Sequence, residues 1–313
     1  MKKVTKILLF AICILAISLV CACLYFLNYA LTPNQRSNFN EENEYKIMKT
    51  DYPNISNWID SIRPHLADTF ITNHENIKLR ARYAAAHDAT PRTAIIIHGY
   101  KMNSLSMLHI AYLFHHDLNY NILLPDLQAH GLSDGDEIQM GWKDKDDIKQ
   151  WIDVANNVFG GHTQMVITGI SMGGATTMMT SGETLPQCVK CFVEDCGYTS
   201  VWDEFCGELD KQFHLPPFPL MHATNLLCEA EYGWTFTQAS AVDQVAKCRL
   251  PMLFIHGDAD TYVPTRMVYE LYKAKAEPKE IYISKGSAHA NSYKDHPDEY
   301  TCRVKNFVSK YID

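Results

Sequence analysis

The chain has 313 residues, of which 47% are apolar, enough for one large or two small domains with a buried core. Its formal net charge is −8 and it has no basic cluster, which argues against nucleic acid as a partner. The sequence shows no internal repeat and no low-complexity segment. The composition therefore predicts a globular protein, with one added feature at its N-terminus.

Residues 1–31 predict a transmembrane helix that acts as a signal anchor. Three lysines precede an uncharged apolar run of 21 residues from Ile7 to Leu27. A helix of this length, at about 1.5 Å per residue, just spans the core of a bilayer. Because positive residues stay on the cytoplasmic side, we expect the rest of the chain on the extracytoplasmic side of the membrane.

Two other interpretations of this segment remain open. A cleaved signal peptide would make the protein secreted, although Asn28-Tyr29-Ala30 is a poor cleavage site. A lipoprotein would carry its lipid on Cys21 or Cys23, although the usual small residue two positions before the cysteine is missing. All three interpretations export the domain that follows.

The boundary between anchor and domain is predicted from a change in composition. Residues 32–50 are polar and lack apolar periodicity, which is typical of a linker. Trp58, Ile59, Ile62 and Leu66 then recur at helical spacing and predict a short amphipathic helix at the edge of a domain that covers residues 51–313.

Within this domain, short apolar runs alternate with helix-like stretches. Residues 70–83 alternate around a turn and predict a hairpin. Continuous apolar runs are typical of parallel strands that are buried on both faces, so we expect an α/β fold with a mostly parallel, doubly wound sheet. These runs cover residues 94–97, 121–124, 165–167, 191–193, 252–255 and 281–283, and the helix-like stretches cover residues 105–116, 143–159, 173–184, 266–276 and 297–311.

Residues 198–247 interrupt this alternation. They are rich in aromatic residues and prolines and show no clear strand. We expect a small helical insertion over the edge of the sheet, either an ordinary structural excursion or a cap that covers a substrate.

The sequence Gly169-Ile170-Ser171-Met172-Gly173 follows the apolar run at 165–167 and precedes a helix-like stretch. It fits G-x-S-x-G, in which a serine stands on a strained turn between a strand and a helix. So tight a turn leaves no room for side chains two residues on either side of the serine, which explains both glycines. Ser171 is therefore a candidate nucleophile.

A serine hydroxyl needs a base, and the base needs a carboxylate to orient it. Asp258 and Asp260 follow one apolar strand, and His289 follows the next. Because the carboxyl ends of parallel strands lie at one edge of the sheet, these residues are expected beside Ser171. The chain order Ser, Asp, His is the one that this geometry requires.

From about residue 68 to the C-terminus the sequence resembles the α/β-hydrolases. The resemblance rests on Ser171 and its two partner motifs, on Ile97-His98-Gly99-Tyr100 and on residues 125–133, which read Pro-Asp-Leu-Gln-Ala-His-Gly-Leu-Ser. Within that superfamily it is most similar to bacterial serine hydrolases of the esterase and serine-aminopeptidase-like branch, many of them exported or membrane-anchored.

The resemblance implies a role for each residue. Ser171 would be the nucleophile and His289 the base. The acid would be Asp260, which is followed by two residues and then Val263-Pro264, while Asp258 would close the turn. Some relatives instead place the acid at the position of Glu194-Asp195. The oxyanion hole would be formed by the backbone amides of Tyr100 and Met172.

Other polar residues are expected to have structural roles. His98 and His256 would hold loops, and the resemblance assigns His130 to a turn with Asp126. No H-E-x-x-H pattern occurs, and the C-x-x-C at Cys188 has no second pair, so we expect no metal and no cofactor. His109, His115 and His116 are expected on a surface helix, and Cys206 and Cys228 would form a disulfide in an extracellular domain.

These observations predict a serine hydrolase that cleaves an ester, thioester or amide of a small-molecule or peptide substrate through an acyl-enzyme, with a carboxylesterase-like activity favoured. The alternatives are an exported serine peptidase or aminopeptidase, a catalytically inactive binding protein that keeps the fold, and an acyltransferase. An aminopeptidase would need acidic residues for the free amine, which the insertion offers at Glu204, Glu208, Glu229 and Glu231.

Overall fold

The computed structural model describes residues 2–33 and 39–313, and within them the central element is an 8-stranded sheet in the order β1-β2-β4-β3-β5-β6-β7-β8. β2 pairs antiparallel with β1 and with β4, and every other pairing is parallel. This confirms the hairpin that leads into a parallel sheet. The strands are β1 (Ala67–Thr72), β2 (Lys78–Ala84), β3 (Arg92–Ile97), β4 (Asn121–Pro125), β5 (Gln164–Ile170), β6 (Val189–Asp195), β7 (Met252–Gly257) and β8 (Lys279–Ser284).

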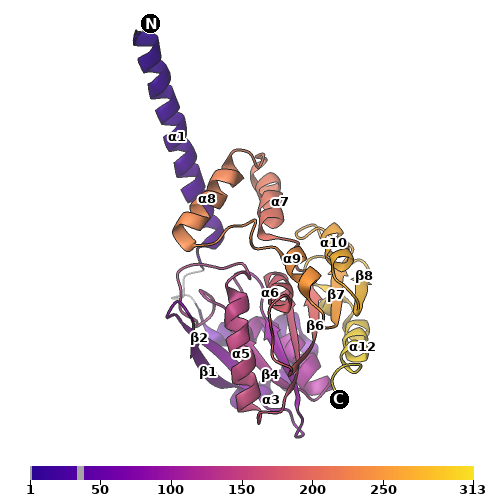
Figure 1. Cartoon of the computed structure of the whole chain (residues 1–313). Helices are drawn as coiled ribbons and strands as arrows, with labels where there is room; N and C mark the ends of the chain where they lie inside the picture. The colour runs from indigo at the N-terminus through magenta and orange to yellow at the C-terminus, as the bar shows by residue number, and fades with distance from the viewer. Residues whose placement is uncertain (1, 34–38) are drawn as a thin grey trace.

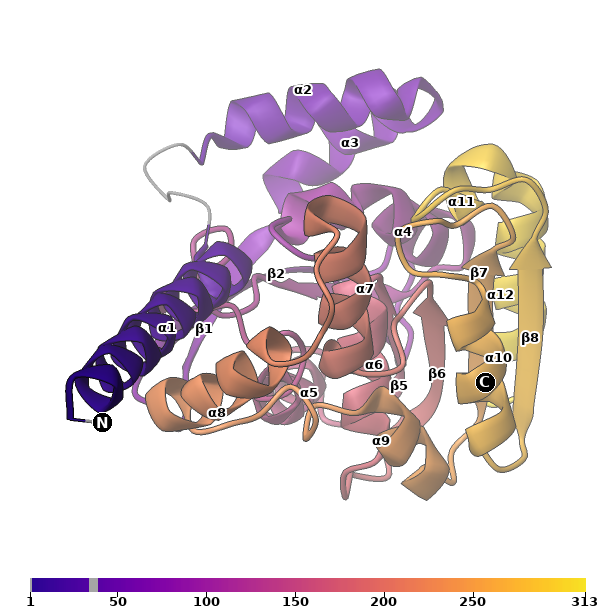
Figure 2. The same ribbon diagram turned by 90° about the horizontal axis from the view of Figure 1, so that it is seen from above.

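Helices cover both faces of the sheet, which explains the continuous apolar runs. On β3, Ile95 and Ile97 belong to one core cluster, whereas Ala94 and Ile96 belong to the other. The first face carries α5 (Asp144–Val158), α6 (Met172–Ser181), α9 (Ala241–Lys247) and α10 (Arg266–Ala274); the second carries α3 (Ser56–Ile62), α4 (Leu108–Tyr112), α11 (Ser292–Asp295) and α12 (Pro297–Val308) (Figures 1 and 2). The predicted fold class is therefore confirmed.

The insertion after β6 is helical, as the sequence predicts. It contains α7 (Val201–Phe213) and α8 (Leu220–Tyr232), which stand above the sheet in Figure 1. A β-bridge between Ser200 and Ser240 closes its base, and each of these serines also caps the helix that follows it. The cap is therefore narrower than residues 198–247, because α9 packs against the body of the domain.

The N-terminal segment is one long helix, α1 (Lys2–Leu31), which extends away from the domain (Figure 1). It is long and apolar enough to cross a membrane, and almost none of its most apolar stretch is buried. Its C-terminal end is different, because Cys23, Leu27 and Leu31 are buried against the domain.

The predicted linker over residues 32–50 is wrong in its second half. Residues 34–38 lie outside the described part of the chain, but α2 (Glu41–Asp51) is a helix. Asn40 accepts a hydrogen bond from the amide of Asn43 at its start, and acidic residues in the first turn favour it through the helix dipole. Tyr45 and Met48, three residues apart, bury one side of α2 in the second core cluster. A single pair of apolar residues is too few to show a helical period in the sequence.

The described part of the chain also contains short helical turns. Their bounds are η2 (Pro53–Ile55), η3 (Arg63–His65), η4 (Ser104–Met107) and η5 (Leu113–Asp117). The amphipathic helix expected near residue 58 is α3, in which Trp58, Ile59 and Ile62 are buried. Leu66 does not belong to it, because α3 ends at Ile62 and Leu66 follows η3 in an extended conformation.

Candidate active site

Ser171 stands on a strained turn between β5 and α6. Its backbone has φ 59° and ψ −120°, a conformation that non-glycine residues rarely adopt. A Cβ at Gly169 would lie 2.3 Å from the carbonyl oxygen of Gly173, and one at Gly173 would lie 2.2 Å from that of Ile97. The two glycines are therefore required by sterics, as the sequence predicts.

The three residues singled out in the sequence form one hydrogen-bonded line. His289 Nε2 lies 2.9 Å from Ser171 Oγ, and His289 Nδ1 lies 2.7 Å from Asp260 Oδ2. They follow β5, β7 and β8, whose parallel pairing through β6 brings their carboxyl ends to one edge of the sheet.

The environment of Asp260 sets the direction of these hydrogen bonds. Burial alone would raise the pKa of Asp260, but hydrogen bonds from His256 and His289 outweigh it and lower the pKa to about 2. The carboxylate is thus charged and can only accept, so Nδ1 of His289 carries the proton. The lone pair of Nε2 then faces the hydroxyl of Ser171, which is the arrangement that a general base requires.

The other carboxylates considered for the acid do not bond to His289. Asp258 accepts from the amide of Gly286 at 2.5 Å and closes the turn. Glu194 accepts from the amide of Gly197, and Asp195 from the hydroxyl of Ser292. The backbone carbonyl of Asp195 instead holds the turn, because it accepts from the amide of Ser171.

Both residues expected at the oxyanion hole line the pocket with Ser171. Met172 is the first residue of α6, so its amide has no acceptor within the helix. Tyr100 follows β3 at the same edge of the sheet, and its hydroxyl donates to the carbonyl of Ala30 at 2.6 Å.

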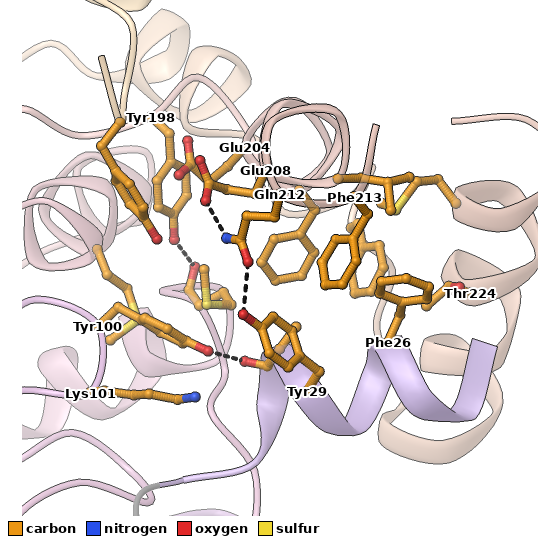
Figure 3. Close-up of a pocket in the computed structure, with 18 of the residues that line it drawn as sticks. Phe26, Tyr29, Tyr100, Lys101, Tyr198, Glu204, Glu208, Gln212, Phe213 and Thr224 are labelled. Carbon is orange, nitrogen blue, oxygen red and sulfur yellow. Dashed lines mark hydrogen bonds between the residues drawn. The ribbon is translucent and has the colours of Figure 1, made fainter. Parts of the chain in front are cut away.

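A cavity of about 210 Å³ extends from Ser171 between the domain, the cap and α1 (Figure 3). Its wall is largely aromatic and aliphatic, which suits an acyl chain. Beyond Ser171, Met172, Tyr100 and Lys101, the lining residues are Phe26, Tyr29, Ala30, Met140, Tyr198, Glu204, Phe205, Glu208, Leu209, Gln212, Phe213, Met221, Thr224, Phe236 and Tyr262.

Sequence reasoning missed two parts of this wall. Phe26, Tyr29 and Ala30 belong to α1, which was interpreted as an anchor alone. Tyr262 stands two residues after Asp260, and the centroid of its ring lies 4.9 Å from the ring centroid of His289. The position of Tyr262 within the motif Asp260-Thr261-Tyr262-Val263-Pro264 could have indicated that it lines the pocket. No signal in the sequence placed α1 at the pocket.

Two of the four acidic residues proposed for amine binding line the cavity. Burial, followed by the neighbouring charge of Glu208, raises the pKa of Glu204 to about 8. Glu208 accepts hydrogen bonds from Lys211 and Gln212. Glu229 and Glu231 are exposed on α8 away from the pocket.

The histidines expected in structural roles hold loops. His98 Nε2 accepts from the amide of Leu127, and His130 Nε2 accepts from that of Lys101. His256 lies between the carbonyl of Val263 at 2.9 Å and Asp260 at 3.3 Å. The surface position predicted for His109 is wrong: it is buried, stacked on Tyr52, because the helix that carries it packs on the sheet.

Cys196, Asp260 and His289 offer ligand atoms within 4.8 Å of one another. Burial raises the pKa of the Cys196 thiol well above its usual value, so it stays protonated, and the other two groups already bond to each other. These residues fit a metal ion poorly. All ten cysteines, each in the described part of the chain, have free thiols, so the expected Cys206–Cys228 disulfide is wrong.

Comparison with known proteins identifies the family. Residues 134–313 match the prolyl oligopeptidase family. The chain is 30% identical over 235 residues to the uncharacterized protein YqkD of Bacillus subtilis (strain 168), which covers 75% of this chain and 76% of YqkD.

Solved structures of similar fold include an esterase and a peptidase. The Pyrococcus furiosus esterase Pf2001 has a TM-score of 0.66 at 20% identity, over 82% of this chain and 96% of that one. An acylaminoacyl peptidase of Pyrococcus horikoshii has a TM-score of 0.59 at 15% identity, over 81% of this chain and 42% of that one. The sheet order, the serine turn and the family match agree, and the chain belongs to the prolyl oligopeptidase family of α/β-hydrolases, as a hydrolase of the serine type.

Proposed function

We propose that the protein cleaves carboxylic esters through an acyl-enzyme in which Ser171 is the nucleophile. The observation that carries this proposal is the line of hydrogen bonds from Asp260 through His289 to Ser171, at 2.7 and 2.9 Å. These distances are within the reach that a nucleophile and its base require before substrate binds.

In the proposed reaction, Nε2 of His289 takes the proton of Ser171 as its oxygen attacks the ester carbonyl. Asp260 stabilises the imidazolium that forms. The tetrahedral intermediate collapses, the carbon–oxygen bond to the alcohol breaks, and His289 gives its proton to the leaving alcohol. Water then attacks the acyl-enzyme by the same route and releases the carboxylic acid.

The amides of Tyr100 and Met172 are proposed to stabilise the oxyanion. Met172 supports this role because it begins α6, whose N-terminal amides favour negative charge. The contribution of one such donor is about 3 kcal/mol in comparable hydrolases.

An ester is favoured over a peptide because the wall beyond Ser171 is mostly apolar. A second candidate, an aminoacyl substrate, is supported by Glu204. A free ammonium group beside this buried carboxylate would restore its charge and offset the burial that raises its pKa to about 8.

The two candidates are separated by a ratio of activities. We expect hydrolysis of p-nitrophenyl butyrate by the full-length protein, and its loss in Ser171→Ala. If the substrate is aminoacyl, Glu204→Gln lowers kcat/KM for alanine p-nitroanilide at least tenfold more than for the butyrate, and the exposed control Glu229→Gln does not. A wild-type protein inert toward both substrates would contradict the proposed function.

We also propose that α1 stays attached as a signal anchor and holds the domain outside the cytoplasm. Cleavage after Ala30 would remove Cys23 and Leu27 from the core and Ala30 from Tyr100. The burial of Cys23, whose thiol approaches the carbonyl of Leu220, argues equally against a lipid at this position.

A further inference from the structure

The helix α1 has two parts with different surroundings. From Val4 to Leu24 its large apolar side chains are mostly exposed, as at Phe10, where 69% of the residue is accessible. From Cys23 to Leu31 one side of the helix is buried against the cap and the domain. Only the first part needs a bilayer to cover it.

The second part of α1 is fixed by specific contacts. Phe26 meets Phe213 edge to face with ring centroids 4.8 Å apart. The hydroxyl of Tyr29 donates to Gln212 Oε1 at 2.7 Å, and Gln212 donates in turn to Glu208 (Figure 3). The carbonyl of Leu31 accepts from the amide of Ile138 at 2.8 Å.

These contacts place α1 in the wall of the pocket that contains Ser171. Phe26, Tyr29 and Ala30 line it, and Ala30 bonds to Tyr100, whose amide we propose for the oxyanion hole. The cavity therefore runs from the nucleophile to the membrane helix.

The position of the bilayer follows from the exposed part of α1. Its uncharged part, the 18 residues from Ile7 to Leu24, forms about 27 Å of helix, close to the thickness of a hydrocarbon core. Tyr25 and Tyr29 then lie at the depth where aromatic residues gather at membrane surfaces. The cap lies beside the C-terminal end of α1, and its α7–α8 loop points along α1 toward the exposed part of that helix (Figure 1).

The cap also carries exposed apolar side chains. Phe218, in the α7–α8 loop, is 72% accessible, and Leu226 on α8 is 65% accessible. Phe218, in the loop that points along α1, is at a level where an apolar group is stable in the interface of a bilayer and unfavourable in water.

We propose that the substrate is an ester of a membrane-resident amphiphile, and that α1 selects its acyl chain. The acyl chain lies along the wall that Phe26 of α1 and Phe213 of the cap form together, with the ester carbonyl at Ser171. This inference rests on the proposed esterase function and adds the class of substrate and the source from which it is taken.

The test uses the full-length protein in phosphatidylcholine nanodiscs and measures kcat/KM for p-nitrophenyl dodecanoate and acetate. Phe26→Trp fills the pocket and is expected to lower the dodecanoate-to-acetate ratio at least tenfold, while the smaller change Phe26→Leu raises it. Phe10→Trp and Phe10→Leu, on the lipid-facing part of the same helix, leave it within twofold. Labelling of Ser171 by a fluorophosphonate verifies that each variant has an assembled site.

A second measurement tests the source of the substrate. With 4-methylumbelliferyl oleate in the same nanodiscs as the enzyme, we expect an initial rate at least tenfold above that with enzyme and ester in separate nanodiscs; equal rates would show that the ester comes from water. Equal ratios in the Phe26 and Phe10 variants would overturn the role of α1. Absence of ester hydrolysis in the wild type would instead refute the proposed function.

Discussion

Asp260 is the most constrained of the proposed catalytic residues. Besides His289 and His256, its carboxylate accepts from the amides of Tyr262 and Val263 at 2.9 and 3.0 Å. These bonds fix its orientation and keep it charged, so it can hold the imidazole of His289 in one tautomer throughout the reaction.

We expect Asp260→Asn to lower kcat for p-nitrophenyl butyrate roughly 10⁴-fold, because an amide in place of the carboxylate favours the wrong tautomer of His289. Asp258→Asn is the matched control in the same loop, and its kcat should stay within about threefold of the wild type. Equal losses in the two variants would show that the loop, and not the charge of Asp260, carries the effect.

The raised pKa of Glu204 makes the stability of the folded protein depend on pH. Its pKa is raised from 4.5 to about 8 by burial, so between these values the folded protein keeps a proton that the unfolded chain releases. The contribution of Glu204 to stability therefore falls as the pH rises from about 4.5 to 8. Glu204→Gln should remove this loss, so its Tm should exceed that of the wild type by a margin that grows from pH 5 to pH 8; a constant margin would contradict the assignment.

At this scale the sequence predicted much of the site. Ser171, Asp260 and His289 lie where their motifs place them, because each follows a strand whose apolar run is unambiguous. Tyr262 and the charge state of Glu204 could not be predicted, since they depend on packing between the cap and the sheet.

Among the elements, the turn between β5 and α6 is one in which a single added carbon atom would collide with the backbone. A Cβ at Gly173 would collide with the backbone of β3, which cannot shift without disturbing the sheet. Gly173→Ala should therefore lower the free energy of unfolding by about 1–3 kcal/mol and also reduce activity.

Gly207, in α7, is the matched control for this substitution. An added Cβ there meets nothing within 4 Å, so Gly207→Ala should stabilise the helix by up to about 1 kcal/mol. Urea unfolding of both variants gives the comparison, and destabilisation of equal size at the two positions would contradict the steric account of the serine turn.

The sequence predicted the type of most elements but not all of their partners. The strands and the main helices were identifiable because their apolar runs are long. The helix α2 was missed because only Tyr45 and Met48 in it are deeply buried, and one such pair does not establish a helical period. The docking of α1 was missed because an apolar helix has the same composition whether lipid or protein covers it.

At the scale of the whole molecule, the C-terminal end of α1, the proposed anchor, packs against the domain and lines its pocket. Because positive residues stay on the cytoplasmic side, Lys3 and Lys6 at the start of α1 predict that the domain lies on the extracytoplasmic side of the membrane. Cys302, exposed on α12, reports on this orientation.

A membrane-impermeant maleimide should label Cys302 in intact spheroplasts. Labelling should fall in Cys302→Ser, which controls for the other thiols. Labelling that requires permeabilised spheroplasts would place the domain in the cytoplasm and contradict the proposed orientation.

The central claim is that Ser171 is an activated nucleophile, and fluorophosphonate labelling of the full-length protein tests it most directly. We expect a stoichiometric mass addition on the peptide that contains Ser171, and none in Ser171→Ala. Absence of labelling in the wild type, or labelling that persists in Ser171→Ala, would contradict the assignment.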